Sequence, residues 1–318
     1  AAVPSDKTAT FEAGTRVHFH ANSGLIIAKN ASININGTPS ATEKLENEVV
    51  FEGDRLEPGF ANVPGQWGTI WLTDGSTNNK VNHLTIKNAT IGLLIQNNDG
   101  TTVSIKNTQI YNSSNYGILA QTAKINGENL VINNAGLASL ACTYGGNYSF
   151  THATFNNNWN SSKQVAVLVS NYISGAIPEA KALTMATFTP ETKNLTEATF
   201  NNCIIYGSYS NEMSLTRKTG AAFEYQFNNC LIKFDNVSNQ FTTNADYQFN
   251  TDSAHYNAIL LNKDPKFFNT SQNKFNIDAT SAAFAKGNSA YLIPLDILGN
   301  TRSLPPDLGA YQNNVFPK

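Results

Sequence analysis

Cysteine and charge are both scarce in this chain of 318 residues. Three cysteines are too few for a disulfide framework, and none forms the Cys-x-x-Cys pair typical of zinc or redox sites. Charged residues make up 14% of the chain and the net charge is −2, so no basic excess could neutralise the phosphates of a nucleic acid. We therefore expect no nucleic-acid partner.

Long apolar segments and helix-forming runs are also missing. No stretch approaches the roughly 20 apolar residues of a membrane span. The first residues lack the charged and apolar pattern of a signal peptide, and the best helix-forming run is residues 179–183. We expect no transmembrane span, and we place any signal or lipid anchor upstream of this chain.

Asparagine, in contrast, is abundant, with 44 copies. Its side chain bonds to nearby backbone groups and tolerates the left-handed conformation, so it concentrates at turns. Between the asparagines lie short segments rich in β-branched and aromatic residues. This composition predicts many short strands joined by tight turns.

One pattern recurs along the chain: apolar, any, apolar, any, Asn, any, any, apolar. Its period of two is typical of a strand with one buried face, and the asparagine suits the bend that follows. The copies are centred on residues 86, 105, 132, 155, 200 and 227. Most gaps of 19–27 residues fit one coil of a parallel β-helix, and the 45-residue gap predicts one coil with an insertion near residues 171–195.

Equivalent positions of successive coils should stack directly on one another. We expect the phenylalanines at 155, 200 and 227 to form one column and the asparagines of the repeat to form one ladder of side-chain hydrogen bonds. The predicted ladder contains Asn88, Asn107, Asn134, Asn157, Asn202 and Asn229. Cys203 and Cys230 occupy equivalent positions; a disulfide or metal site is one interpretation, and two small buried thiols without further ligands is the favoured one.

The sequence therefore predicts an all-β fold, a single-domain right-handed parallel β-helix (solenoid). Coils should occupy residues 1–262, and a non-repetitive C-terminal cap of the same domain should occupy residues 263–318. A solenoid end exposes unpaired strand edges and core side chains, so it needs a cover. Arg302 and Asp307 could form a structural ion pair across that cap.

Motifs near both ends resemble those of Bacteroidetes surface β-helix proteins of the pectate-lyase-like superfamily. The resembling segments are Gln66-Trp-Gly-Thr-Ile70, Asp264-Pro-Lys-Phe267, and the ending Asp296-Ile-Leu-Gly-Asn-Thr-Arg302 with Pro306-Asp-Leu-Gly-Ala-Tyr311. The group typically has Trp-Gly-Gly-Ile at the first segment, and it closes with Glu where Gln312 stands here. The resemblance implies a pectate-lyase-like β-helix that is secreted or attached to the cell surface or outer membrane, and it implies no particular reaction.

A catalytic constellation is not evident. Enzymes on such a scaffold bring ionisable groups together on the outer face of adjacent coils. The densest charged cluster holds Glu52, Asp54 and Arg55, which would offer two acids and a guanidinium; its alternative role is a solvated loop. We therefore assign no catalytic residue, although these three residues are the candidates if there is one. We lean towards a protein that is not an enzyme.

The sequence also contains no clear motif for a metal or cofactor site. Asp235, Asp246, Asp252 and His255 fall in one irregular stretch and could hold Ca²⁺. Their spacing is not that of a known calcium loop. We expect no metal and no cofactor, and leave Ca²⁺ open.

Aromatic residues favour a binding function. Sugars stack on aromatic rings and hydrogen-bond to surrounding amides and hydroxyls. The candidates, for which core packing is the alternative, are Trp71, Tyr144, Tyr148, Trp159, Tyr206 and Tyr209. We expect a monomeric, non-catalytic surface or secreted protein that binds polysaccharide or another glycan, or acts as an adhesin or scaffold. The alternative is a polysaccharide lyase or glycoside hydrolase that acts on an acidic polysaccharide.

Overall fold

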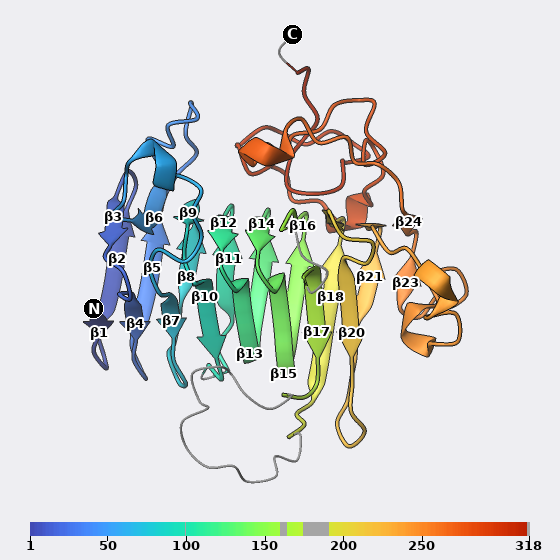
Figure 1. The fold of residues 1–318 in the computed structure, drawn as a ribbon, viewed down its shortest axis with the longest axis horizontal. Helices are drawn as coiled ribbons and strands as arrows, with labels where there is room; N and C mark the ends of the chain where they lie inside the picture. Colours follow the sequence, from blue (N-terminus) through green and yellow to red (C-terminus); the bar gives the residue numbers. More distant parts are fainter. Residues whose placement is uncertain (99, 160–163, 174–190, 317–318) are drawn as a thin grey trace.

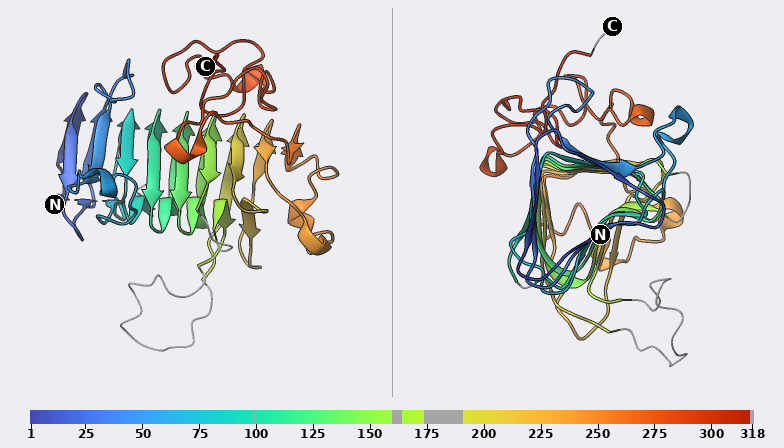
Figure 2. Two further views of the ribbon diagram at one scale, coloured as in Figure 1. Left: turned by 45° about the horizontal axis from the view of Figure 1, so that its top comes forward. Right: turned by 90° about the vertical axis from the view of Figure 1, so that its left-hand side faces the viewer.

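The computed structural model describes residues 1–98, 100–159, 164–173 and 191–316. In these residues the chain consists almost entirely of strands and tight corners, and it winds repeatedly around one axis (Figure 1 and Figure 2). We call one such winding a coil. Strands of successive coils pair in parallel, so the chain is nearly all β with parallel sheets, an architecture compatible with a β-solenoid.

Within the described residues the strands fall into three rows. The first row contains β1 (Ala2–Val3), β4 (Leu25–Ile27), β7 (Ile70–Leu72), β10 (Ile91–Gln96), β17 (Val165–Ser170) and β20 (Met213–Thr216). The second row contains β2 (Thr8–Glu12), β5 (Ser32–Asn36), β8 (Lys80–Asn82), β11 (Val103–Lys106), β18 (Leu195–Asn201), β21 (Gln226–Asn228) and β23 (Tyr256–Asn257). The long strands β13 (Tyr116–Glu128) and β15 (Ala138–Thr151) turn the corner between these two rows and join them into one sheet.

The third row forms a separate sheet. It contains β3 (Arg16–Phe19), β6 (Val49–Gly53), β9 (Leu84–Lys87), β12 (Gln109–Ser113), β14 (Val131–Ala135), β16 (Thr154–Asn157), β19 (Ile204–Gly207), β22 (Leu231–Ile232) and β24 (Leu260–Leu261). Short 3-10 turns lie in the connections: η1 (Pro58–Phe60), η3 (Val237–Asn239), η4 (Ala245–Tyr247), η5 (Thr270–Gln272) and η6 (Ser289–Tyr291). No helix among the described residues is long and apolar enough to cross a membrane.

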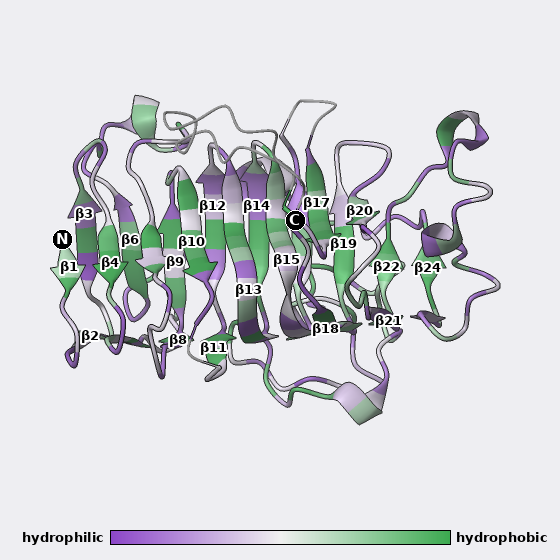
Figure 3. Ribbon diagram, turned by 90° about the horizontal axis from the view of Figure 1, so that it is seen from below, coloured by the Kyte–Doolittle hydropathy of each residue, from purple (hydrophilic) through white to green (hydrophobic). Residues whose placement is uncertain are grey.

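The core runs along the winding axis because equivalent side chains stack from coil to coil. Ile86, Ile110, Ile132 and Phe155 are in register in the third row, and all four are buried. Their alternation with outward-facing residues follows from the period of two along a strand. Figure 3 shows the apolar residues concentrated in strands such as β10 and β17, with polar residues at many of the connections.

The repeat asparagines lie at two different corners, so the prediction of a single ladder was wrong. One group lies at the ends of strands of the third row: Asn88 directly follows β9, and Asn134 and Asn157 lie among the last residues of β14 and β16. The other group follows strands of the second row: Asn107, Asn202 and Asn229. Both corners have the same local pattern in the sequence, a strand, a bend and a second strand. The pattern alone therefore places all the asparagines in one group.

Each corner has its own ladder of side-chain hydrogen bonds. After the third row, Asn134 Nδ2 donates to Asn112 Oδ1 (2.8 Å), and Asn112 Nδ2 donates to Asn88 Oδ1 (3.3 Å). After the second row, Asn129 donates to Asn107 (2.9 Å), which donates to Asn82 (2.9 Å). Most of these residues have a positive φ, between 47° and 62°, which asparagine tolerates better than other residues with a Cβ.

The aromatic column also differs from the prediction. Phe200 stacks on Phe227 at 4.7 Å and on Phe150 at 5.4 Å between ring centroids. Phe155 lies in the third row and meets Phe150 and Phe200 edge-on, because it belongs to another strand of the coil. The two cysteines at 203 and 230 are free and fully buried, as the buried-thiol interpretation expected.

The long gap in the repeat, from Phe155 to Phe200, lies within a single coil. Phe155 of β16 pairs directly with Ile205 of β19, with no other strand between them. An antiparallel bridge joins Tyr172 and Thr192. The expected insertion near residues 171–195 lies largely outside the described residues, at 174–190.

The C-terminal segment, residues 263–316, packs along the side of the stack and not over its end as predicted (Figure 1). Val131, Ile204 and Leu231 face outward from the third row and are buried against this segment. Each precedes an inward-facing isoleucine, so both faces of these strands are apolar. These strands therefore have two buried faces at these positions, where the alternation in the sequence predicts one.

An aromatic cluster of residues 234–256 lies in the connection between β22 and β23, at the last coil. Tyr247 stacks on Phe234 at 4.6 Å between ring centroids, and Phe249 lies 4.7 Å from Tyr256. These loops lie at the end of the stack in Figure 1, beside β23. They occupy the place where the sequence predicted the C-terminal cap.

Arg302 and Asp307 are both buried, but no direct ion pair links them in the described structure. Arg302 Nη2 donates to Asn129 Oδ1 (2.9 Å) and to the carbonyls of Gly309 (3.1 Å) and Ala310 (3.0 Å). Burial lowers the pKa of Arg302 to about 10, and the nearby carboxylates of Asp296 and Asp307 partly oppose that shift. Arg302 therefore ties the C-terminal segment to the asparagine ladder after the second row.

Candidate functional site

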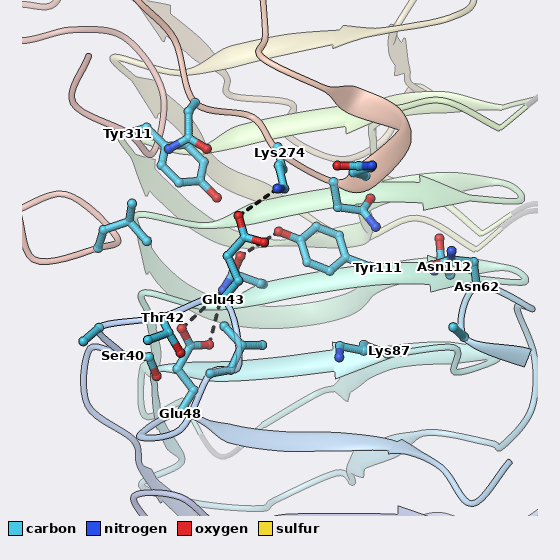
Figure 4. Close-up of a pocket in the computed structure, with 18 of the residues that line it drawn as sticks. Ser40, Thr42, Glu43, Glu48, Asn62, Lys87, Tyr111, Asn112, Lys274 and Tyr311 are labelled. Carbon is cyan, nitrogen blue, oxygen red and sulfur yellow. Dashed lines mark hydrogen bonds and ion pairs between the residues drawn. The ribbon is translucent and has the colours of Figure 1, made fainter. Parts of the chain in front are cut away.

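A cleft of about 710 Å³ opens on the outer face of the third row (Figure 4). The loop before β6 forms one wall, β9 and β12 form the floor, and the C-terminal segment forms the other wall. Most of the lining side chains are neutral and polar; the charged ones are Glu43, Glu48, Lys87 and Lys274. The cleft thus joins parts of the chain that are far apart in the sequence.

Strand register explains why the cleft lies here. Lys87 pairs with Tyr111, and Phe51 pairs with Ile86, so Glu52, Lys87 and Tyr111 follow one another along the outer face. From Val131 onward, outward residues of this face such as Val131, Ile204 and Leu231 are covered by the C-terminal segment. The cleft lies where the C-terminal segment begins to cover this face.

Glu48 is buried at the edge of the cleft and organises its floor. Its Oε2 accepts hydrogen bonds from Thr85 Oγ1 (2.6 Å) and Gln109 Nε2 (3.2 Å). Burial raises the pKa of Glu48, and these hydrogen bonds together with the charges of Arg16 and Lys87 oppose the shift. The carboxyl group of Glu48 is therefore fixed by hydrogen bonds to neighbouring side chains of the protein.

Two tyrosines carry this network into the cleft. Tyr111 donates from its hydroxyl to Gln109 Oε1 (2.7 Å), and it interacts with the hydroxyl of Tyr311 from the C-terminal segment. Burial raises the pKa of both phenols well above the ordinary value. Both therefore remain neutral hydroxyl groups that can donate and accept hydrogen bonds.

Each lysine of the cleft faces a carboxylate. Lys87 Nζ lies 3.6 Å from Glu52 Oε2, and Lys274 Nζ lies 2.7 Å from Glu43 Oε1. Figure 4 shows Glu43 reaching from its loop towards Lys274 of the C-terminal segment. The Glu43 side chain is 83% exposed, so this second pair is in contact with solvent.

The suspected catalytic residues do not converge. Glu52 lies in the third row between Lys87 and His18, whose Nδ1 is 3.8 Å away. Asp54 pairs with His20 in a separate contact. Arg55 instead lies 3.0 Å from Glu57. Glu52 thus belongs to strand β6, and Asp54 and Arg55 belong to the exposed loop that follows it.

The residues considered for Ca²⁺ are likewise divided among other partners. Asp246 lies 3.2 Å from Arg217, and Asp252 lies 2.6 Å from His255 Nδ1. Across the described residues, no group of three or more His, Cys, Asp and Glu side chains is placed to hold a metal. The four residues thus form no shared ligand set.

Of the predicted ligand-binding aromatics, Tyr148 is fully buried in the core and donates to the Gly145 carbonyl (2.8 Å), so it cannot stack on a sugar. Trp71 lies on the outer face of the first row, where its Nε1 donates to Gln96 Oε1 (2.8 Å). Tyr206 lies beneath the C-terminal segment, 6.4 Å from Phe267 between ring centroids. None of these three lines the cleft.

The other three aromatic candidates lie at corners. Tyr144 follows the first-row part of β15 and has the Lys193 ammonium 4.7 Å from its ring. Trp159 and Tyr209 lie between the third and first rows. These three also lie outside the cleft. The rings that do line it are Tyr111 and Tyr311, which the sequence analysis missed; the outward position of Tyr111 beside Gln109 was the available signal.

Comparison with known proteins adds no family to these observations. No protein-family model matches the chain, and no curated protein matches it. The cleft is therefore interpreted from its own geometry.

Proposed function

We propose that this chain is a right-handed parallel β-helix of the exported, surface-associated kind that its motifs resemble, and that it binds a glycan in the cleft without catalysing a reaction. In this proposal the protein is monomeric and serves as an adhesin or scaffold outside the cell. The stacked coils give a rigid face, and a rigid site loses less conformational entropy when it binds. The C-terminal segment and the loop before β6 form the walls of the site on that face.

The lining of the cleft is the observation that carries the proposal. Amides from Asn62, Asn112 and Asn273 meet in one cleft with the phenol hydroxyls of Tyr111 and Tyr311, two buried tyrosines that are hydrogen-bonded to each other. Such groups can both donate and accept hydrogen bonds, as sugar hydroxyls require. Sites with a few convergent polar groups in a concave surface are typical of small-molecule and sugar recognition.

The arrangement of the acids favours binding over catalysis. Glu48 already accepts hydrogen bonds from Thr85 and Gln109, and Glu43 is exposed and paired with Lys274. A hydrolase would need two carboxyl groups that face one substrate position. Such a facing pair is not formed by Glu48 and Glu43.

One observation favours a second function, a lyase or hydrolase for an acidic polysaccharide. Glu48 has a raised pKa and an electrostatic interaction with Lys87, which also lines the cleft. A carboxyl group with a raised pKa near an ammonium could serve acid–base chemistry if a substrate displaced Gln109. Incubation with uronate polymers, followed by unsaturated-product absorbance and reducing-end assays, distinguishes the two functions.

The binding proposal is tested with a glycan array and a matched pair of blocking variants. Ala61 is exposed and lines the cleft, so Ala61→Trp fills it without removing a polar side chain. Ala21 is exposed and lies outside the cleft, so Ala21→Trp is the control. We expect wild type and Ala21→Trp to bind the same glycans and Ala61→Trp to lose them. An array without a hit for wild type contradicts the proposal.

A further inference from the structure

The Glu43–Lys274 pair joins two walls of the cleft. Glu43 belongs to the loop before β6, and Lys274 belongs to the C-terminal segment, more than 200 residues later. Their charged atoms are 2.7 Å apart, and both residues line the cleft. The carboxylate of Glu43 therefore marks a position in the cleft where an anionic group fits.

Solvent exposure makes this contact exchangeable. The side chain of Glu43 is 83% exposed and that of Lys274 is 30% exposed. An exposed ion pair contributes little stability, because water solvates both charges and the side chains lose freedom when they pair. Another anion that makes additional contacts in the cleft can therefore replace Glu43.

Glu43 and Glu46 differ in how firmly the loop holds them. Glu46 Oε1 accepts from the backbone nitrogen of Ala41 (2.8 Å), and Glu46 Oε2 accepts from Thr42 Oγ1 (2.7 Å), so this carboxylate is fixed within the loop. The described contact of the Glu43 carboxylate is with Lys274. Glu43 can thus leave Lys274 while Glu46 preserves the shape of the loop.

We propose that Lys274 is an anion subsite of the cleft, that Glu43 occupies it when no ligand is bound, and that a glycan with carboxylate or sulfate groups binds by displacing Glu43. This inference rests on the proposed glycan-binding function and names the ligand class. Lys87 provides a second ammonium on the floor of the same cleft. The neutral hydroxyls and amides between the two lysines would contact the uncharged part of the sugar.

The test measures affinity by titration calorimetry with three probes of equal length: an oligogalacturonate, a sulfated oligosaccharide and a neutral oligoglucan. The variants are Glu43→Gln, Lys274→Gln and the double variant. Glu57→Gln and Lys286→Gln are the matched controls: Glu57 is exposed and pairs with Arg55, Lys286 is exposed, and both lie outside the cleft. Circular dichroism and thermal melts check that each variant folds as wild type does.

We expect Glu43→Gln to bind the charged probes about two- to fivefold more tightly than wild type. This range corresponds to the free energy that an exposed ion pair typically contributes. Lys274→Gln should reduce their affinity towards that of the neutral probe. In the Lys274→Gln background, Glu43→Gln should have no further effect, because the two residues act through one contact. The carboxylated and sulfated probes distinguish the two sources of the anion.

Unchanged affinity for the charged probes in both Glu43→Gln and Lys274→Gln overturns the inference. Tighter binding of the neutral probe than of both charged probes also overturns it. In either case the glycan-binding proposal survives, provided that the array gives hits that Ala61→Trp abolishes. Failure of wild type and Glu43→Gln to bind any glycan removes both proposals together.

Discussion

Thr85 Oγ1 lies 2.6 Å from Glu48 Oε2 and donates a hydrogen bond to it at the buried edge of the cleft. The contact joins the residue before β6 to the outer face of β9 in the next coil. Gln109, one coil further along, donates to the same oxygen at 3.2 Å. One carboxyl group therefore links three successive coils of the third row.

Removal of the Glu48 carboxyl group should destabilise the protein. We expect Glu48→Ala to lower the free energy of unfolding by about 1–3 kcal/mol, because the buried hydroxyl of Thr85 and amide of Gln109 lose their acceptor. Urea denaturation at pH 7 measures the loss. The same variant should also weaken glycan binding, since Gln109 positions the hydroxyl of Tyr111.

Glu48→Gln is the matched control for this prediction. It keeps one side-chain oxygen as an acceptor but cannot ionise, and burial disfavours the ionised form of Glu48. We expect its stability at pH 7 to equal or exceed that of wild type. Equal destabilisation by the alanine and glutamine variants would show that the hydrogen bonds to Glu48 do not stabilise the packing of these three coils.

Asn107 should show how much a ladder asparagine contributes. It donates to Asn82 Oδ1 (2.9 Å), accepts from Asn129 Nδ2 (2.9 Å), and has a φ of 47°. Asn107→Gly removes the side-chain hydrogen bonds but allows the positive φ, whereas Asn107→Ala also strains the backbone. We expect a loss of about 1–2 kcal/mol for glycine and about 1 kcal/mol more for alanine in urea denaturation.

The comparison of these two variants separates the two effects. An alanine variant as stable as the glycine variant would mean that the left-handed backbone at this corner adds nothing measurable. A glycine variant as stable as wild type would mean that the ladder hydrogen bonds add nothing. Asn78 also has a positive φ (51°), lies in an exposed turn, and supplies the control position.

The parallel pairing of successive coils could be predicted because its signal is local. Alternation along each strand marks the inward residues, and asparagine marks the corners. The assignment of residues to columns failed, since Asn88 and Asn107 have the same local pattern but end strands of different rows. Only the pairing register separates them, and register depends on contacts between coils.

The cleft could not be predicted from local patterns. Its walls are formed by the loop with Glu43 and the segment with Lys274, and their contact spans most of the chain. The apolar pairs such as Val131-Ile132 do carry a signal that was available: two consecutive buried residues in a strand indicate that both faces are covered. That signal locates the docking face of the C-terminal segment, and the cleft lies at its border.

Glu212 should make the protein less stable as the pH rises. Burial raises the pKa of this carboxyl group to about 8, although Tyr209 donates a backbone hydrogen bond to it (2.7 Å). Between pH 4.5 and 8 the unfolded chain releases this proton and the folded protein retains it, so unfolding becomes easier as the pH increases. We expect a contribution of about 2–3 kcal/mol between pH 5 and 7.

Glu212→Gln should remove that contribution. Urea denaturation at pH 5, 6, 7 and 8 should show that the variant gains stability relative to wild type as the pH rises. The exposed Glu224→Gln serves as the control and should follow the wild-type profile. A constant difference between Glu212→Gln and wild type across this range would show that Glu212 ionises equally in the folded and unfolded states.

His152 should have the opposite effect. It is fully buried at the corner after the second row, where its Nε2 accepts from Asn202 Nδ2 (3.1 Å) and its Nδ1 donates to the Gly309 carbonyl (3.3 Å). Burial and the neighbouring charge of Arg302 lower its pKa from 6.5 to about 3. The unfolded chain therefore takes up a proton below pH 6.5 that the folded protein does not bind, so stability falls as the pH decreases towards 3.

We expect this histidine to lower the free energy of unfolding by about 2 kcal/mol at pH 5 relative to pH 7. His152→Gln should be less stable than wild type at pH 7, because the shorter amide cannot reproduce both contacts, but it should lose less stability on acidification. The control is His20→Gln, whose side chain is 88% exposed. Because Glu212 acts in the opposite direction between pH 4.5 and 6.5, the comparison is made between variants and not within the wild-type profile. A parallel decline of His152→Gln and wild type from pH 7 to pH 4 would show that this ring does not control acid stability.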